Sequence, residues 1–236
     1  MKRMSLLRNG LGAALLLFSL TACEDDDEMM QESKARVMVV HASPDAPAVD
    51  LLVDNVKVNA TALSYPNNTG YLEVASGTRN FKVNAAGTTT TVINADVPLM
   101  ENAAYSVFAF DRVAQIKPLV VMDNLATPAS GKAHIRFLHL SPGAPAVTIG
   151  ILNGSAFTPV FSNRTFETAA TATANQGFTP VDAGTYNFDV RLADGTTSVL
   201  TVPNIPLQAG KIYTVFARGI VGNTTSPLGA SLIVHN

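Results

Sequence analysis

Two histidines occupy the same place in a repeated segment, and their type and position suggest chemistry. The segments have the pattern His-x-Ser-Pro-x-Ala-Pro-Ala-Val and begin at His41 and His139. A histidine at the end of a strand can bind a metal or act as a general base, but either role requires further donors nearby. The repeated segment supplies only serine, proline and, in its first copy, one aspartate. We therefore interpret each histidine as hydrogen-bonded to the following turn, and we expect no catalytic residue, metal or cofactor.

Three aspartates of the first copy, Asp45, Asp50 and Asp54, could suggest a calcium loop. Their spacing lacks the alternating acids and the central glycine of an EF-hand. Even spacing places Asp50 and Asp54 on one face of a strand, so a solvated polar face explains them. A weak calcium site at the end of the domain is the alternative.

Motifs typical of enzymes are missing from the sequence. It has no nucleophile elbow, phosphate-binding loop, dinucleotide motif or His-Glu-x-x-His. We therefore predict a protein that is not an enzyme. An envelope hydrolase acting on carbohydrate is the alternative, because its two carboxylates could come from distant parts of the chain.

The composition excludes several classes of partner. The 236 residues include 16 basic and 18 acidic side chains, a single cysteine and no tryptophan. A basic nucleic-acid-binding protein, a disulfide scaffold and a cysteine-rich zinc site are therefore excluded. Tyr65, followed by Pro66-Asn67-Asn68, is the aromatic residue in a loop-like context and the candidate ligand contact; packing against its own loop is the alternative.

The first 23 residues have the pattern of an export signal. Lys2, Arg3 and Arg8 precede an apolar run at 11–20, which is too short to span a bilayer. The following Leu20-Thr21-Ala22-Cys23 resembles the lipobox of bacterial lipoproteins. The resemblance implies that residues 1–22 are a signal peptide and that lipidated Cys23 attaches the protein to a membrane. An ordinary secretory signal is the alternative.

An acidic tether is expected at residues 23–35, because residues 24–28 are all acidic. One interpretation is a spacer repelled by anionic lipid headgroups. The other is a sorting signal, since the run resembles those that send some Bacteroidota lipoproteins to the cell surface. Both place the protein in the bacterial cell envelope, at the outer membrane.

The remainder of the chain consists of two copies of one sequence repeat. The two histidine segments are offset by 98 residues (139 minus 41). The match continues downstream, where 77–83 resembles 184–190, 105–109 resembles 213–217, and Pro118-Leu119 resembles Pro227-Leu228. We predict two domains, at 36–125 and 132–236, joined by a linker of turn-forming residues.

Each unit is predicted to consist of strands. Apolar residues alternate with polar ones, as at Phe81 and Val83 in the first unit and Phe188 and Val190 in the second. Signals for tight turns, such as Asp54-Asn55, separate these runs. We expect about seven short strands per unit, no amphipathic helix and an all-β fold of two antiparallel sandwiches.

Two resemblances refine this expectation. The segments ending at Tyr105 and Tyr213 resemble the tyrosine corner of immunoglobulin-like and fibronectin-type sandwiches, which implies a hydroxyl hydrogen-bonded to the chain upstream. Together with the histidine segments, each unit resembles the bacterial family called domain of unknown function 4397. The first copy is closer, because Gly143 and Thr148 replace Asp45 and Asp50.

The family resemblance implies secreted or cell-surface bacterial proteins and supplies no catalytic residues. We therefore expect a lipid-anchored envelope protein that serves binding, adhesion or assembly. An envelope protein or a glycan would be its partner, and nucleic acid would not. A purely structural spacer is the remaining alternative.

Overall fold

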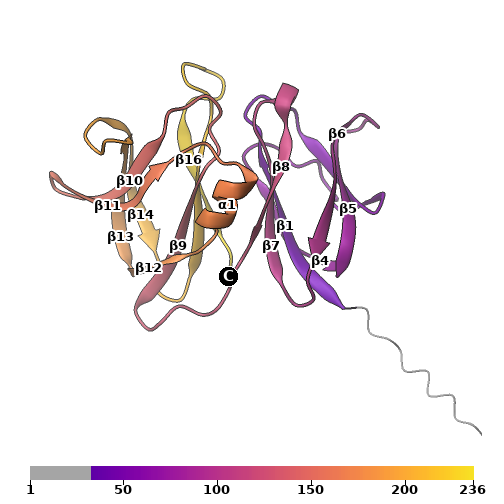
Figure 1. Ribbon diagram of the computed structural model, residues 1–236, viewed down its shortest axis with the longest axis horizontal. Helices are drawn as coiled ribbons and strands as arrows, with labels where there is room; N and C mark the ends of the chain where they lie inside the picture. Colours follow the sequence, from indigo (N-terminus) through magenta and orange to yellow (C-terminus); the bar gives the residue numbers. More distant parts are fainter. Residues whose placement is uncertain (1–32) are drawn as a thin grey trace, which may run out of the picture. The chain divides into compact units, whose positions relative to one another are not determined.

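The computed structural model describes residues 33–236. The predicted signal peptide, Cys23 and most of the predicted tether lie outside the described residues. The described part contains sixteen strands, one α-helix and one 3-10 turn, arranged as four sheets in two similar halves (Figure 1). Between residues 33 and 236, no helix has the length and apolar character needed to cross a bilayer.

The first half is built from two four-stranded sheets, with strand orders β4-β1-β7-β8 and β3-β2-β5-β6. The 3-10 turn η1, Val113–Gln115, lies between β7 and β8. The strands are β1 (Lys34–Ala42), β2 (Val49–Val53), β3 (Val56–Lys57), β4 (Asn68–Ala75), β5 (Gly77–Ala85), β6 (Thr91–Leu99), β7 (Ala104–Phe110) and β8 (Lys117–Met122).

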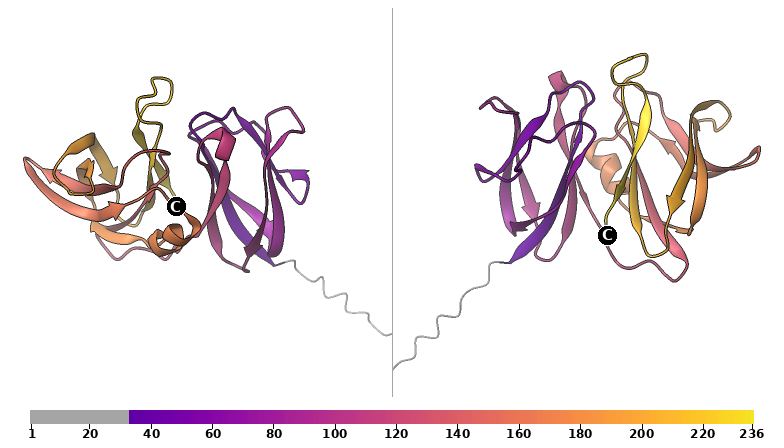
Figure 2. Two further views of the ribbon diagram at one scale, coloured as in Figure 1. Left: turned by 45° about the horizontal axis from the view of Figure 1, so that its top comes forward. Right: turned by 180° about the vertical axis from the view of Figure 1, so that it is seen from behind.

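The second half repeats this arrangement, with orders β12-β9-β15-β16 and β11-β10-β13-β14. Its elements are β9 (Lys132–His139), β10 (Val147–Asn153), β11 (Ala156–Arg164), α1 (Ala169–Asn175), β12 (Thr179–Asp182), β13 (Gly184–Leu192), β14 (Ser198–Leu207), β15 (Ile212–Arg218) and β16 (Gly229–Val234). Figure 2 shows the two sheets of each half facing one another.

The structure confirms a mostly β fold and corrects three details. Each half has eight strands, not seven. The sheets are not purely antiparallel, because β1 pairs with β7, and β9 with β15, in parallel; alternation marks a strand but does not encode the direction of its neighbour. Helix α1 was not expected, because its seven residues bury only Ala172 and so show no apolar stripe; the side chain of Thr168 caps it.

Local chemistry explains why the strands turn where they do. Asp54 and Asn55 both have positive φ, at 49° and 68°, which is the conformation that a two-residue hairpin between β2 and β3 requires. The predicted tyrosine hydrogen bonds are also confirmed. The Tyr105 hydroxyl accepts from the Met100 amide, and the Tyr213 hydroxyl accepts from the Gln208 amide, each at 3.0 Å.

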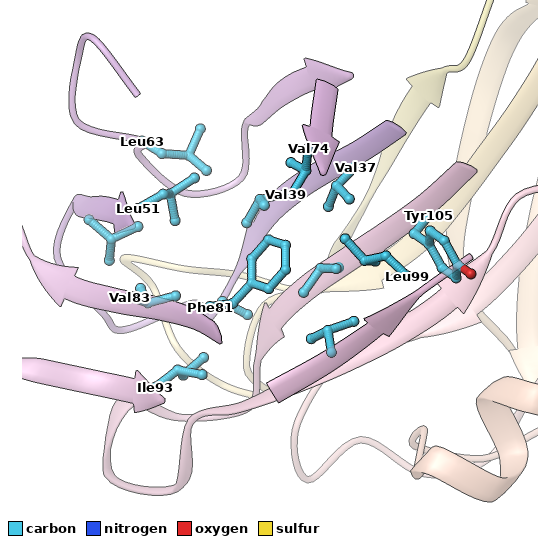
Figure 3. Close-up of a cluster of buried hydrophobic side chains, with 14 of the residues drawn as sticks. Val37, Val39, Leu51, Leu63, Val74, Phe81, Val83, Ile93, Leu99 and Tyr105 are labelled. Atoms are coloured by element: carbon cyan, nitrogen blue, oxygen red, sulfur yellow. The ribbon is translucent and has the colours of Figure 1, made fainter. Parts of the chain in front are cut away.

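Three clusters of buried apolar side chains hold the described residues together. One lies inside the first half and includes Phe81 and Ile93 (Figure 3). Another lies inside the second half and includes Phe137 and Phe188. The third is formed by both halves, from members of β1, β7 and β8 together with members of β9, α1, β15 and β16. Each half therefore has its own core and contributes one sheet to a shared core.

Strand pairing identifies the equivalent residues of the two halves. The equivalent tyrosines Tyr105 and Tyr213 pair with Met122 and Val234. The residues that follow these partners, Asp123 and His235, are therefore equivalent. By the same criterion Phe108 is equivalent to Phe216. Their rings meet edge-on with centroids 5.9 Å apart. Contact between equivalent residues is the signature of a two-fold interface, so the halves pack as a homodimer would.

Candidate binding site

His41 and His139 are hydrogen-bonded to the following turn, as predicted. Their Nε2 atoms lie 2.9 Å and 3.0 Å from the carbonyl oxygens of Pro47 and Pro145. Because a carbonyl only accepts, each Nε2 is the donor. Both side chains are fully buried, and burial lowers the pKa of each imidazole. The two histidines are therefore neutral turn-forming residues.

The three aspartates do not come together. Asp45 accepts from the Val113 amide at 2.7 Å, and Asp54 accepts from the Asn80 amide at 2.9 Å. Asp50 is buried, contrary to the solvated face expected, because the Lys57 ammonium lies 2.8 Å from it. Within residues 33–236, no cluster of three or more His, Cys, Asp or Glu side chains could hold a metal ion.

Tyr65 lies in the loop between β3 and β4 and is half-buried. Its ring packs edge-on against His41, with centroids 6.1 Å apart. The guanidinium carbon of Arg218, from the other half, lies 5.9 Å from the centre of the Tyr65 ring. The Tyr65 hydroxyl is buried without a hydrogen-bond partner among the described residues. This aromatic residue therefore lies where the two halves meet.

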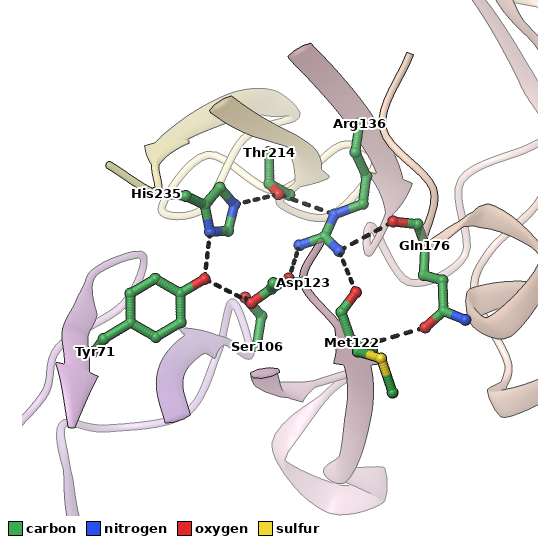
Figure 4. A network of polar contacts seen from close by, with 8 residues as sticks. All are labelled: Tyr71, Ser106, Met122, Asp123, Arg136, Gln176, Thr214 and His235. Atoms are coloured by element: carbon green, nitrogen blue, oxygen red, sulfur yellow. Dashed lines mark hydrogen bonds and ion pairs between the residues drawn. The ribbon is translucent and has the colours of Figure 1, made fainter. Parts of the chain in front are cut away.

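A buried polar network joins the halves, which the sequence did not reveal (Figure 4). The carboxylate of Asp123, which follows β8, lies at its centre and accepts several of its hydrogen bonds. Its carboxylate lies 2.7 Å from the Arg136 guanidinium of the second half, and both side chains are fully buried. It also accepts from the hydroxyls of Tyr71 at 2.7 Å and Ser106 at 2.8 Å.

The same network continues through His235. The Arg136 Nε donates to the Thr214 hydroxyl at 2.9 Å. That hydroxyl lies 2.7 Å from Nε2 of His235, whose Nδ1 lies 2.8 Å from the Tyr71 hydroxyl. Since Tyr71 donates to Asp123, its oxygen accepts from Nδ1, and Nε2 accepts from Thr214. The bonds form a closed ring in which His235 is neutral.

Burial dominates the electrostatics of this ring. It lowers the pKa of His235 to about 4, with the charge of Arg136 acting in the same direction and that of Asp123 opposing it. Burial, reinforced by Asp123, raises the pKa of the Tyr71 hydroxyl far above its usual range. At neutral pH His235 is therefore uncharged and Tyr71 keeps its hydroxyl proton. None of them lines the cavities described below, so the ring connects the halves and does not face a substrate.

A cavity of 230 Å³ lies at one end of the second half. It begins where β9 ends and is bounded by the turn after His139, by β14 and by the loop between β15 and β16. Apolar side chains form most of its wall, among them Phe137, Val147, Val190, Leu200, Ala217 and Ala230. Val199, Val221 and Leu228 also line it and are 44%, 53% and 36% exposed. The cavity is therefore an apolar hollow with an apolar mouth.

Several polar groups of this wall are hydrogen-bonded to other parts of the protein. Nδ1 of His139 accepts from the Ser141 amide, and the Ser141 hydroxyl donates to the Gly219 carbonyl at 2.7 Å. The Arg218 Nε donates to the Ser231 hydroxyl at 2.8 Å. A ligand in the cavity would be held mainly by shape and apolar contact, because the side chains of His139 and Ser141 are already hydrogen-bonded within the protein.

At the equivalent place in the first half, beside Ala109 and Pro118, only a small hollow of 20 Å³ is found within the described residues. Pro118 pairs with Ala109 of β7, and Ala230 pairs with Ala217, the equivalent residue of β15. Pro118 and Ala230 are therefore equivalent positions. This corrects the predicted match of Pro118-Leu119 with Pro227-Leu228. The loop before β16 has ten residues, 219–228, where the loop before β8 has six, 111–116. Ile116 packs on the first core, where only 20 Å³ remains.

A second hollow, of 250 Å³, lies on the first half around residues 58–63. Its wall is mixed, with Asn59, Thr61 and Asn68 beside Val58 and Leu72. The Asn59 amide is committed to the backbone, since it accepts from the Leu51 amide and donates to the Val49 carbonyl. No aromatic residue lines this hollow, so it lacks the platform on which a sugar ring would stack.

Residues 35–150 match the model of the family described as "Domain of unknown function (DUF4397)". The chain contains a DUF4397 domain. The match covers the first half, β9 and the beginning of β10, and so extends beyond the boundary predicted at residue 125. The second half resembles this DUF4397 domain through the internal repeat, as equivalent strand orders show. No protein with a curated description matches the chain.

Solved structures give only distant likenesses. A carbohydrate-binding module of family CBM26 from Eubacterium rectale, in complex with maltoheptaose, is 10% identical and covers 84% of this chain and 96% of its own, with a TM-score of 0.24. A candidate cell adhesion protein from Parabacteroides distasonis is 11% identical. The match covers 86% of this chain and 99% of that protein, with a TM-score of 0.21. A second candidate cell adhesion protein, from Bacteroides fragilis, is 10% identical. The match covers 85% of this chain and 97% of that protein, with a TM-score of 0.22.

Proposed function

We propose that this protein is a lipid-anchored module of the bacterial cell envelope that binds a partner and catalyses no reaction. The observation that carries the proposal is the 230 Å³ cavity, whose wall is mostly apolar and whose histidine and serine are hydrogen-bonded within the protein. Binding sites are typically concave and mostly apolar. A catalytic site would instead bring free ionisable groups to such a hollow.

The body of this module would be two immunoglobulin-like units, at 36–125 and 132–236. The paired sheets of each half and the two tyrosine hydrogen bonds support that assignment. In this view, Cys23 carries the lipid, the acidic residues after it form the tether, and Tyr65 contributes to the surface where the halves meet. The membrane would be the outer membrane.

Binding is tested by capture from envelope fractions, with residues 33–236 as bait and Ala230→Leu as the matched variant. Ala230 lines the cavity on an edge strand, so a larger side chain fills the hollow without disturbing the buried ring. We expect a partner that the wild-type bait captures and the variant does not. Hydrolysis of envelope glycans by the same bait would contradict the proposal.

The anchor is tested separately. The chain has one cysteine, so Cys23→Ala removes every site for a thioether-linked lipid, and we expect the variant to leave the membrane fraction. Persistence in membranes after a high-salt wash would exclude lipidation as the attachment.

A structural spacer remains the second candidate, and the buried junction favours it. The ion pair between Asp123 and Arg136 and the shared core fix one half against the other, as a rigid spacer requires. A spacer would capture no partner in the experiment above.

A further inference from the structure

We propose that the second half binds one linear hydrocarbon chain, such as the acyl chain of a lipid, between β14 and β16. This inference rests on the proposed binding function and names its ligand. The 230 Å³ cavity adjoins a second one of 60 Å³, and both are lined by Phe137, Val190 and Ala230. The smaller cavity is also lined by Val202 and Ile205 of β14 and by Leu232 of β16. Together they describe an elongated apolar space.

The topology explains why this space is reachable. Strands β14 and β16 are each the last strand of a sheet, so no strand pairing closes the side of the sandwich between them. Leu200 and Ile205 of β14 remain half-buried, whereas their equivalents in β6, Ile93 and Val97, are buried. The second sandwich is therefore incompletely filled along the seam that an inserted chain would occupy.

The chemistry of the wall selects the ligand. A sugar or peptide backbone placed deep in this space would leave most of its polar groups unpaired, because the side chains of His139 and Ser141 are engaged with protein partners and the rest of the inner wall is apolar. A hydrocarbon chain has no polar group to satisfy and gains free energy from every methylene it buries. The exposed Val199 and Val221 extend the apolar surface outward from the mouth.

The experiment measures the fluorescence of cis-parinaric acid, a linear polyene fatty acid, on titration with residues 33–236, which lie within one compact unit. We expect saturable binding of one probe per chain. Ala230→Leu fills the space, and Val221→Asp places a charge at its mouth; each should weaken binding by about tenfold or more. Val113→Asp is the matched control, because Val113 follows β7 as Val221 follows β15 and is 38% exposed; its affinity should equal that of the wild type.

Two results would overturn the inference. One is absence of saturable probe binding while Ala230→Leu raises the melting temperature, which would make the space a packing defect. The other is equal probe affinity in the wild type and Ala230→Leu. Partner capture by Ala230→Leu at the wild-type level would instead show that the proposed binding function uses another surface, whatever the probe does.

Discussion

At the scale of single residues, the contact between the two halves depends on equivalent positions that carry different residues in the two copies. Strand pairing makes Met38 equivalent to Arg136 and Asp123 equivalent to His235. In two identical copies, a buried carboxylate would face a methionine, which costs several kcal/mol when no partner compensates the charge. The arginine in the second copy alone supplies that partner. The two halves are therefore complementary to each other and not to themselves.

His235 makes the stability of the protein depend on pH. Its pKa is lowered from 6.5 to about 4 in the folded protein, so below pH 6.5 the unfolded chain binds more protons than the folded one. The free energy of unfolding should fall as the pH drops from 6.5 to 4, by at most about 1.4 kcal/mol per pH unit for this group. Tyr71, Asp123, Arg136 and Thr214 surround the imidazole, and a second ring proton at Nε2 would displace the hydrogen that Thr214 donates to it.

Urea unfolding of the wild type and His235→Gln over this pH range provides the measurement. The variant should show a shallower dependence. Some dependence remains, because burial also lowers the pKa of His41 and His139. Equal slopes for the two proteins would mean that His235 does not titrate with unfolding.

Tyr213 should contribute to stability and not to binding. Its hydroxyl accepts from the Gln208 amide at 3.0 Å, and Tyr213→Phe leaves that donor unpaired, which costs about 1–3 kcal/mol. Chemical denaturation measures the loss, and probe binding by the folded variant serves as the control. Unchanged stability with abolished binding would instead identify Tyr213 as a ligand contact.

At the scale of elements, the loop 219–228 forms the mouth of the cavity and depends on two glycines with positive φ. Gly219 and Gly222 have φ of 88° and 73°. A Cβ at Gly219 would overlap the backbone of Pro227, whereas a Cβ at Gly222 would meet open space. Both alanine variants incur about 1–2 kcal/mol for the left-handed backbone.

Gly219→Ala should incur a further cost of about 1–3 kcal/mol, typical of overpacking. It should also weaken probe binding, because the Gly219 carbonyl holds Ser141 of the cavity wall. Thermal unfolding and probe titration of both variants compare the positions. Equal destabilisation of the two would show that the loop relaxes away from the overlap.

At the scale of the whole molecule, the shared core governs how the halves behave when separated. Residues 33–125 retain their own core, so we expect them to unfold cooperatively. They also expose Met38, Phe108, Phe110, Leu119 and Val121, which the second half otherwise covers. An exposed apolar face of this kind promotes association.

Mixing the separated halves tests this expectation. Residues 33–125 and 126–236 should form a one-to-one complex in analytical ultracentrifugation, because only the mixed pair joins Asp123 to Arg136. Arg136→Met makes that position match the first half and should weaken the complex. Monomeric halves with no affinity for one another would show that the linker, not the interface, holds them together.

Much of the architecture follows from the sequence alone. The histidine segments and the tyrosine motifs establish the duplication, and alternation establishes strands, because one buried face imposes a period of two on each strand. The two tyrosine hydrogen bonds and the histidine contacts were predictable for a similar reason, since each joins residues close together in the chain.

Only the tertiary structure decided the features that join distant residues. The parallel partner of β1, the ring through Asp123, Arg136 and His235, and the cavity beside Ala230 bring together residues up to 164 positions apart, as Tyr71 and His235 are. Neither periodicity nor motif spacing reports such contacts, because they depend on which sheet faces pack. The loop before β16, four residues longer than its counterpart, borders the cavity of the second half, and no functional motif of the sequence marks that place.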